Sequence, residues 1–219
     1  HQDCSEDTYR TLMAADSAVM VIDGSKGVEA QTRKLFKVCV MRHIPIFTFI
    51  NKMDREANDP FELLDEIESV LGIATCPINW PIGCGKEFKG VYDRKQREVS
   101  LFKAAMNGQK EVATKNIALD DPELKAEIGD AYLSKLDEDV ELLDGASAEF
   151  DLAKVQAGDL TPVFFGSALT NFGVQTFLEH FLSMTTSPLP RKSDQGVIDP
   201  FTEDFSAFVF KIQANMNKA

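Results

Sequence analysis

Cysteine and histidine are scarce in this sequence, and their spacing excludes two classes of site. The four cysteines, Cys4, Cys39, Cys76 and Cys84, form no C-x-x-C pair and lie far apart. A chain of 219 residues can bury a core without disulfides, so this pattern predicts reduced thiols and a cytoplasmic protein. Zinc sites need clustered Cys and His ligands. Because the chain has only three histidines, we expect no metal site within it.

Long apolar runs are also missing. No stretch approaches the roughly 20 apolar residues that cross a bilayer, and the polar, acidic start at His1 does not resemble a secretory signal. We therefore expect no membrane partner. The chain does not begin with methionine, which leads us to expect a piece of a longer protein.

Positive charge is in short supply, with 23 Lys and Arg against 35 Asp and Glu and a net charge of −12. Sequence-independent binding of nucleic acid needs a basic surface, so we expect no binding to free DNA. The acidic excess is concentrated in residues 110–160, which hold 14 acidic residues and 5 lysines. This segment is either an ordinary solvated surface or a docking face that attracts a basic partner.

The sequence does contain short apolar runs that alternate with amphipathic segments. This alternation predicts an α/β fold, with a mostly parallel sheet and helices on both faces. Strands are expected at residues 18–22, 45–50, 76–82 and 162–165, and helices at 30–42, 60–71 and from 171 onward.

Capping residues mark two of these helices. Asp59 is suited to the N-cap of one helix, Pro60 to its first turn and Gly72 to its carboxyl end. Asn171 is expected to cap the last helix. Its buried side is expected to carry Val174, Phe177, Leu178, Phe181 and Leu182.

The alternation is interrupted between residues 84 and 160 by a candidate hairpin and two acidic helical segments, which we interpret as an inserted α+β lobe. A Pro-containing polar stretch then predicts a linker at 188–204, and alternating apolar residues predict a strand that starts a further domain. The expected division is a nucleotide-binding domain (1–83 and 161–187), an inserted acidic subdomain (84–160), the linker, and a first strand (205–219).

The loop that follows the strand ending at Ile50 carries the motif N-K-M-D. In open α/β sheets, ligands bind at the carboxyl ends of the strands. The carboxylate of Asp54 can accept two hydrogen bonds from the N1–H and 2-amino groups of guanine, which adenine does not offer. Asn51 can meet the other base edge or tie neighbouring loops, and the aliphatic stem of Lys52 can lie across the base or ribose.

A second loop with the sequence G-S-A-L follows the strand that ends at Phe165. Its residues Ser167, Ala168 and Leu169 can present backbone N–H groups to O6 of guanine. Each loop alone is compatible with an ordinary turn. Together, after two buried strands, they predict a guanine site.

The motifs N-K-M-D at 51–54 and G-S-A at 166–168 resemble the fourth and fifth motifs of the translational GTPases, in the same order. His1-Gln2-Asp3 resembles the residues that follow D-T-P-G in that family's third motif. The resemblance implies a P-loop GTPase fold whose amino-terminal part is missing here, followed by the start of a β-barrel domain. Three stretches, 5–10, 80–92 and 208–216, resemble the class II release-factor branch more than elongation factor G.

The resemblance implies a protein that binds and hydrolyses GTP on the ribosome, near the sarcin–ricin RNA loop, and helps class I release factors to dissociate. His1 would be the catalytic histidine that orients the attacking water, and the acidic lobe would contact the ribosomal stalk protein. Two alternatives stay open. One is a translocating GTPase like elongation factor G, and the other is a non-catalytic module that binds the ribosome.

The phosphate-binding motif G-x-x-x-x-G-K-[ST] does not occur in the 219 residues. The nearest Gly-Lys pair, Gly85-Lys86, lacks the first glycine and the following hydroxyl residue. We therefore expect the residues that hold the phosphates and Mg²⁺ to lie upstream of His1. The chain alone should neither hold Mg²⁺–GTP tightly nor hydrolyse it.

Overall fold

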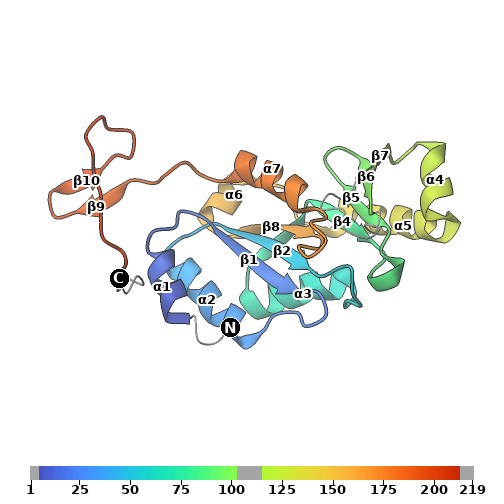
Figure 1. Cartoon of the computed structure of the whole chain (residues 1–219), viewed down its shortest axis with the longest axis horizontal. Helices are drawn as coiled ribbons and strands as arrows, with labels where there is room; N and C mark the ends of the chain where they lie inside the picture. Colours follow the sequence, from blue (N-terminus) through green and yellow to red (C-terminus); the bar gives the residue numbers. More distant parts are fainter. Residues whose placement is uncertain (1–4, 103–114, 213–219) are drawn as a thin grey trace, which may run out of the picture.

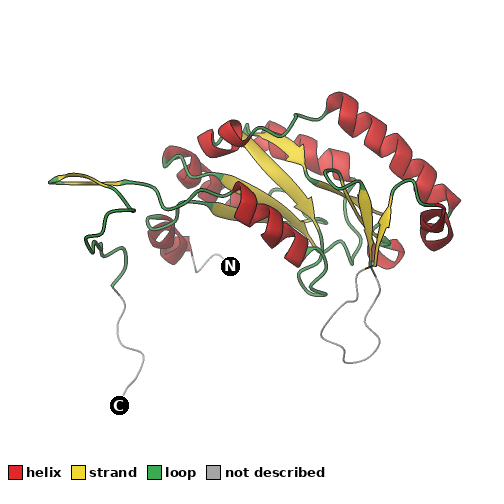
Figure 2. Cartoon of the chain, turned by 90° about the horizontal axis from the view of Figure 1, so that it is seen from above, coloured by secondary structure: helices red, strands yellow, loops and turns green. Residues whose placement is uncertain are grey.

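The computed structural model describes residues 5–102 and 115–212, whose strands form two four-stranded sheets and one two-stranded sheet. Figures 1 and 2 show helices on both faces of the first sheet and the second sheet beside it. No helix in the described part of the chain is long and apolar enough to cross a membrane.

The first sheet is wholly parallel, with the strand order β1-β2-β8-β3. Its strands are β1 (Ala18–Asp23), β2 (Ile46–Asn51), β8 (Leu160–Phe165) and β3 (Ala74–Pro77). Two groups of helices cover its faces, as Figure 1 shows. One group is α1 (Ser5–Leu12), α2 (Ala30–Met41) and α3 (Pro60–Leu71), and the other is α6 (Leu152–Ala157) and α7 (Val174–Met184). The predicted α/β fold is confirmed.

Alternating side chains of the two central strands fill a core on each face of this sheet. On the face toward α7, the rings of Phe49 and Phe164 have centroids 5.4 and 5.0 Å from that of Phe177. On the opposite face, Phe165 packs edge-on against Trp80 with centroids 5.4 Å apart. Because both faces are covered, β8 is buried along its whole length.

The helix α3 begins and ends where its sequence predicts. The Asp59 side chain accepts hydrogen bonds from the N–H groups of Phe61 and Glu62, at 2.9 and 3.3 Å, and such a cap contributes about 1 kcal/mol. Pro60 occupies the first turn. Gly72 ends the helix in the left-handed conformation, with φ of 71°.

The single strand predicted at residues 76–82 is two strands in two sheets. β3 pairs with β8 in the parallel sheet, whereas β4 (Asn79–Ile82) pairs with β5 in the second sheet. The chain changes sheets at Ile78, whose N–H donates to the carbonyl of Val163 at 2.9 Å. A continuous apolar run cannot show this change, because both strands are buried.

The second sheet is antiparallel, with the order β4-β5-β6-β7. It begins at Asn79, before the predicted lobe boundary at residue 84, and the other strands are β5 (Gly90–Asp93), β6 (Glu98–Leu101) and β7 (Lys115–Ala118). The helices α4 (Pro122–Ile128) and α5 (Asp130–Ala146) follow. The indole N–H of Trp80 donates to Asp139 of α5 at 3.0 Å, so α5 is fastened to β4.

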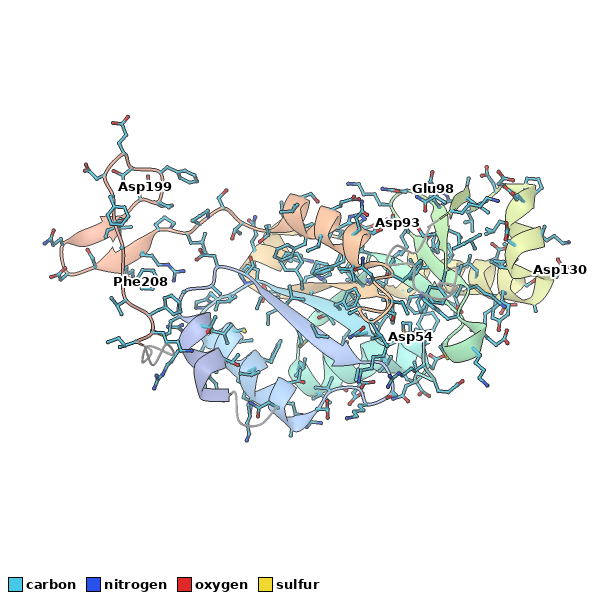
Figure 3. The ribbon with its side chains drawn as sticks, in the orientation of Figure 1. Asp54, Asp93, Glu98, Asp130, Asp199 and Phe208 are labelled. Atoms are coloured by element: carbon cyan, nitrogen blue, oxygen red, sulfur yellow. The ribbon has the colours of Figure 1, made fainter. Side chains whose placement is uncertain are left out.

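The helix α7 differs from its prediction at its start and along its buried side. Its N-cap is Gly173, with φ of 76°, so the expectation that Asn171 caps it was wrong. Leu178 and Leu182 are 49% and 73% exposed. His180 is buried instead. Its polar ring has a partner there, since its Nε2 lies 2.9 Å from Oδ2 of Asp93 on β5. Asp93 lies beside α7 in Figure 3, and the contact joins the two sheets.

The carboxyl-terminal region also departs from its prediction. The predicted linker contains a small antiparallel hairpin of β9 (Arg191–Ser193) and β10 (Gly196–Ile198), which lies apart from the larger sheets in Figure 1. Residues 205–212, the described part of the predicted last strand, form no strand. A strand needs a neighbour for its backbone groups, and none pairs with this segment among the described residues. Residues 213–219 lie outside them.

Candidate functional site

Both loops singled out in the sequence leave the same edge of the parallel sheet. β2 and β8 are neighbours, with Ile50 paired to Phe165, so the residues that follow each strand emerge side by side. Figure 3 shows Asp54 beyond the carboxyl ends of these strands. The backbone N–H of Met53 donates to the carbonyl of Gly166 at 3.1 Å, which joins the two loops at their start.

Asn51 connects the loops through its side chain. Its Oδ1 accepts hydrogen bonds from the N–H of Lys52 and from the N–H of Ala168, both at 2.8 Å. The first bond holds the turn of its own loop, and the second reaches the G-S-A-L loop. A base O6 placed here would compete with this oxygen for the N–H of Ala168.

Asp54 and Ser167 form the second side-chain connection. The hydroxyl of Ser167 donates to Oδ1 of Asp54 at 2.5 Å. Ser167 is completely buried, and it is held by two backbone hydrogen bonds to Phe172, at 2.9 and 3.0 Å. Because Ser167 is itself held in place, this bond fixes the orientation of the Asp54 carboxylate. A carboxylate that accepts two N–H groups of one base must have a fixed orientation.

Lys52 forms an ion pair that sequence analysis did not anticipate. Its Nζ lies 2.5 Å from Oδ2 of Asp23, whose Oδ1 also accepts from the N–H and hydroxyl of Ser25 at 3.0 and 2.8 Å. Asp23 ends β1, the next parallel strand. The only sequence signal for it is that position, an acidic residue at the carboxyl end of a buried strand.

The environment of Asp23 keeps its side chain ionised. Burial acts to raise its pKa, but hydrogen bonds from Lys52 and Ser25 outweigh burial and lower the pKa from 3.8 to about 2. The side chain of Lys52 is 43% exposed and that of Asp23 is 11% exposed. The side chain of Lys52 therefore stays partly exposed beside the loop, while its charge is held at the carboxyl end of β1.

The remaining candidate residues lie at the rim of the site or outside the described chain. Leu169 is 76% exposed, and Ala168 is also exposed. The predicted catalytic residue His1 lies outside the described residues. Within the described ranges, no three His, Cys, Asp or Glu side chains cluster as a metal site would need.

The donor and acceptor set of the two loops suits a guanine base. A carboxylate, an amide and a backbone N–H meet at one sheet edge, from Asp54, Asn51 and Ala168, and the N–H of Ala168 is bonded to Asn51 in this structure. The same edge offers no motif for phosphates, since G-x-x-x-x-G-K-[ST] is absent from the sequence. The arrangement can recognise a base.

Comparison with known proteins gives a family match over most of the chain. The family model described as Elongation factor Tu GTP binding domain matches residues 1–187. The chain is 58% identical over 219 residues to peptide chain release factor 3 of Symbiobacterium thermophilum, covering 100% of this chain and 42% of that protein. It is 55% identical over 217 residues to peptide chain release factor 3 of Gloeobacter violaceus, covering 99% and 41%.

The chain therefore spans about two fifths of the length of the curated relatives that it matches. Among solved structures, a crystal structure of a protein from Thermus thermophilus is similar in fold, with a TM-score of 0.62 and 22% sequence identity. That similarity covers 85% of this chain and 29% of the other chain.

The ion pair of Asp23 predicts a specific dependence of stability on pH. The folded-state pKa of about 2 lies below the ordinary 3.8, so the ionised carboxylate stabilises the fold above pH 4, and this contribution is lost as the pH falls toward 2. Replacing Asp23 by Asn should lower the free energy of unfolding by about 1 kcal/mol or less at pH 7, because its partner Lys52 is 43% exposed and solvent screens the pair.

Urea unfolding of both proteins between pH 7 and pH 2.5 tests this prediction. The difference between wild type and Asp23→Asn should shrink as the pH falls below 4. In a Lys52→Met background the difference should be smaller at every pH, since the main partner is gone. A wild-type to variant difference that stays constant over the whole pH range would contradict the assignment.

Proposed function

The chain belongs to the translational GTPase family, with a GTP-binding domain of the elongation factor Tu type, and we propose that its two connected loops bind the guanine base of GTP and GDP. In this proposal Asp54 accepts the N1–H and 2-amino groups, and Asn51 and Lys52 hold the base edge and its plane. Ser167 orients Asp54, and the backbone of Ala168 and Leu169 faces O6.

The observation that carries this proposal is the connection of Asp54 to buried Ser167 across two loops at one sheet edge. A carboxylate held in this way discriminates between purines by their donors, because adenine would leave it without partners. An isolated N-K-x-D turn would not hold its carboxylate in one orientation. The paired loops do, through Asn51 and Ser167.

For the whole protein, we propose a GTPase of the release factor 3 type, which promotes the recycling of class I release factors from the ribosome in translation termination. Curated relatives with that name cover 99–100% of this chain at 53–58% identity. This supports the release-factor role over the translocation role of elongation factor G. A role on the ribosome also implies the cytoplasm, in keeping with the free thiols of Cys39, Cys76 and Cys84.

We further propose that GTP hydrolysis requires segments that this chain does not contain. The phosphate-binding motif is absent from its sequence, and phosphoryl transfer depends on positioned phosphates, Mg²⁺ and an oriented water. In the longer protein His1 would orient that water near the sarcin–ricin loop. The ligands of Mg²⁺ are proposed to lie in those other segments.

The purified 219-residue chain is therefore expected to release no phosphate from GTP above the rate of buffer alone. Its affinity for fluorescent GDP should be weaker by several orders of magnitude than that of a full-length relative, since base contacts alone remain. Phosphate release and fluorescence titration measure both quantities. Turnover by the purified chain, or tight binding of GDP to it, would refute the proposal.

Guanine selectivity should depend on Asp54. In a full-length protein that contains this chain, Asp54→Asn should weaken GDP binding by on the order of 100-fold, because two charge-assisted hydrogen bonds are lost. Affinity for xanthosine diphosphate should rise, since the 2-carbonyl of xanthine can accept a hydrogen bond from the new amide. Competition titrations with the two nucleotides give the ratio of affinities.

Asp59→Asn is the matched control for this experiment. It removes the same charge close to the loop, but Asn caps a helix as well as Asp does, so selectivity should not change. If Asp54→Asn kept the wild-type preference for guanine, the proposed base site would be wrong.

We also propose that the acidic lobe docks the ribosomal stalk protein. Asp137, Glu138 and Glu141 are exposed on α5. Asp139, which shares this acidic run, is only 8% exposed and bonded to Trp80, so it belongs to the packing of the lobe. Three exposed charges on one helix can steer a basic partner at low salt.

The combined variant Asp137→Asn, Glu138→Gln and Glu141→Gln should slow ribosome-stimulated GTP turnover of the full-length protein. The reduction should be roughly threefold to tenfold at low salt and should disappear at high salt, as expected for screened attraction. The control neutralises three exposed acids near the β9–β10 hairpin, Asp194, Glu203 and Asp204. Equal rates for wild type and both variants at low salt would leave the lobe as an ordinary solvated surface.

A further inference from the structure

The last residue of β8 has lost its partner strand on one side. β3 pairs with β8 only as far as Pro77 and Val163, because the chain leaves the parallel sheet at Ile78. Phe165 is completely buried, so a backbone N–H or carbonyl left without a partner there would be costly. The G-S-A-L loop begins at the next residue, which makes the position of Phe165 important for the site.

The side chain of Asn79 replaces the missing strand. Its Oδ1 accepts from the N–H of Phe165 at 2.7 Å, and its Nδ2 donates to the carbonyl of Phe165 at 3.1 Å. A side-chain amide carries the same donor and acceptor as a peptide group, so one residue pairs as a strand would. Asn79 is 1% exposed, which excludes water as an easy substitute.

The N-K-M-D loop has a support of its own, from Gly85, which follows β4 in the sequence. The N–H of Gly85 lies 3.0 Å from the carbonyl of Met53 and 3.1 Å from that of Arg55. Gly85 adopts a φ of 60°, a conformation that disfavours side chains. Since the N-K-M-D loop has this support of its own, a shift of Phe165 would move the G-S-A-L loop relative to it and strain the bond from Ser167 to Asp54.

We propose that Asn79 is a positioning residue for guanine recognition, which sets the place of the G-S-A-L loop through the backbone of Phe165. The inference rests on the proposed function of the two loops and names a residue outside both of them. Its effect on guanine binding is expected to be largest at the O6 edge of the base. O6 faces the backbone of Ala168 and Leu169, whereas the N1–H and 2-amino groups face Asp54 on the separately held loop.

The test uses three nucleotides that report on different base edges. The compound 6-thio-GDP replaces O6 by sulfur, a weaker acceptor, whereas inosine diphosphate lacks only the 2-amino group. In a full-length protein that contains this chain, Asn79→Ala should weaken GDP binding by about tenfold, because the G-S-A-L loop is no longer held in place through the backbone of Phe165. It should narrow the preference for GDP over 6-thio-GDP at least about threefold, and the preference for GDP over inosine diphosphate by a smaller factor, because Asp54 is reached only through its bond to Ser167.

Thr161→Val is the matched control, because Thr161 makes a buried hydrogen bond at the opposite end of the same strand, to the carbonyl of Ile46 at 2.8 Å. It should lower the thermal stability but leave both preferences as in wild type. Asn79→Ser serves as a milder variant if Asn79→Ala does not fold. Its hydroxyl is too short to make both bonds, and it should narrow the same preference to a smaller degree.

Two results would overturn the inference, and they can be told apart. If Asn79→Ala and Asn79→Ser fold and keep the wild-type preference for GDP over 6-thio-GDP, Asn79 has a structural role only. If wild type itself binds GDP no better than ADP, the proposed function fails, and this inference fails with it.

Discussion

The pairing of Ile50 with Phe165 on neighbouring parallel strands is the constraint on which the candidate site depends. Because parallel strands end at one edge, the two loops that follow emerge side by side. Three hydrogen bonds then join them, from Ser167 to Asp54, from Ala168 to Asn51 and from Met53 to Gly166. A shift of one residue in this register would reverse the side chains of a buried strand and separate all three pairs.

The second sheet contributes to the frame of this site. In the sequence it is inserted between β3 and β8, which are neighbouring strands of the parallel sheet. The chain therefore leaves the parallel sheet after β3, and the last residue of β8 has no backbone partner on that side. Asn79 supplies the missing backbone partner, and Trp80 covers Phe165. The contact between Asp93 and His180 then fastens the second sheet to α7. The inserted second sheet therefore helps to hold the two loops of the candidate site in place.

Local signals were sufficient where the physical cause is local. The ends of α3 were predictable because Asp59, Pro60 and Gly72 act on backbone groups within a few residues of themselves. The cap of α7 was predicted wrongly, since Gly173 follows a loop whose shape is set by the bridge between Ser167 and Phe172. The burial of His180 was not predictable either, because its partner Asp93 lies in another sheet.

The sequence by itself determined the alternation of strands and helices, the family and the two loop motifs, because hydrophobic periodicity and turn chemistry are encoded in short segments. Tertiary structure alone decided the change of sheets at Ile78, the ion pair of Lys52 with Asp23 and the role of Asn79 beside Phe165. Each of these joins residues on different strands. Their partners are chosen by strand order and register, which are global properties of the packed sheet.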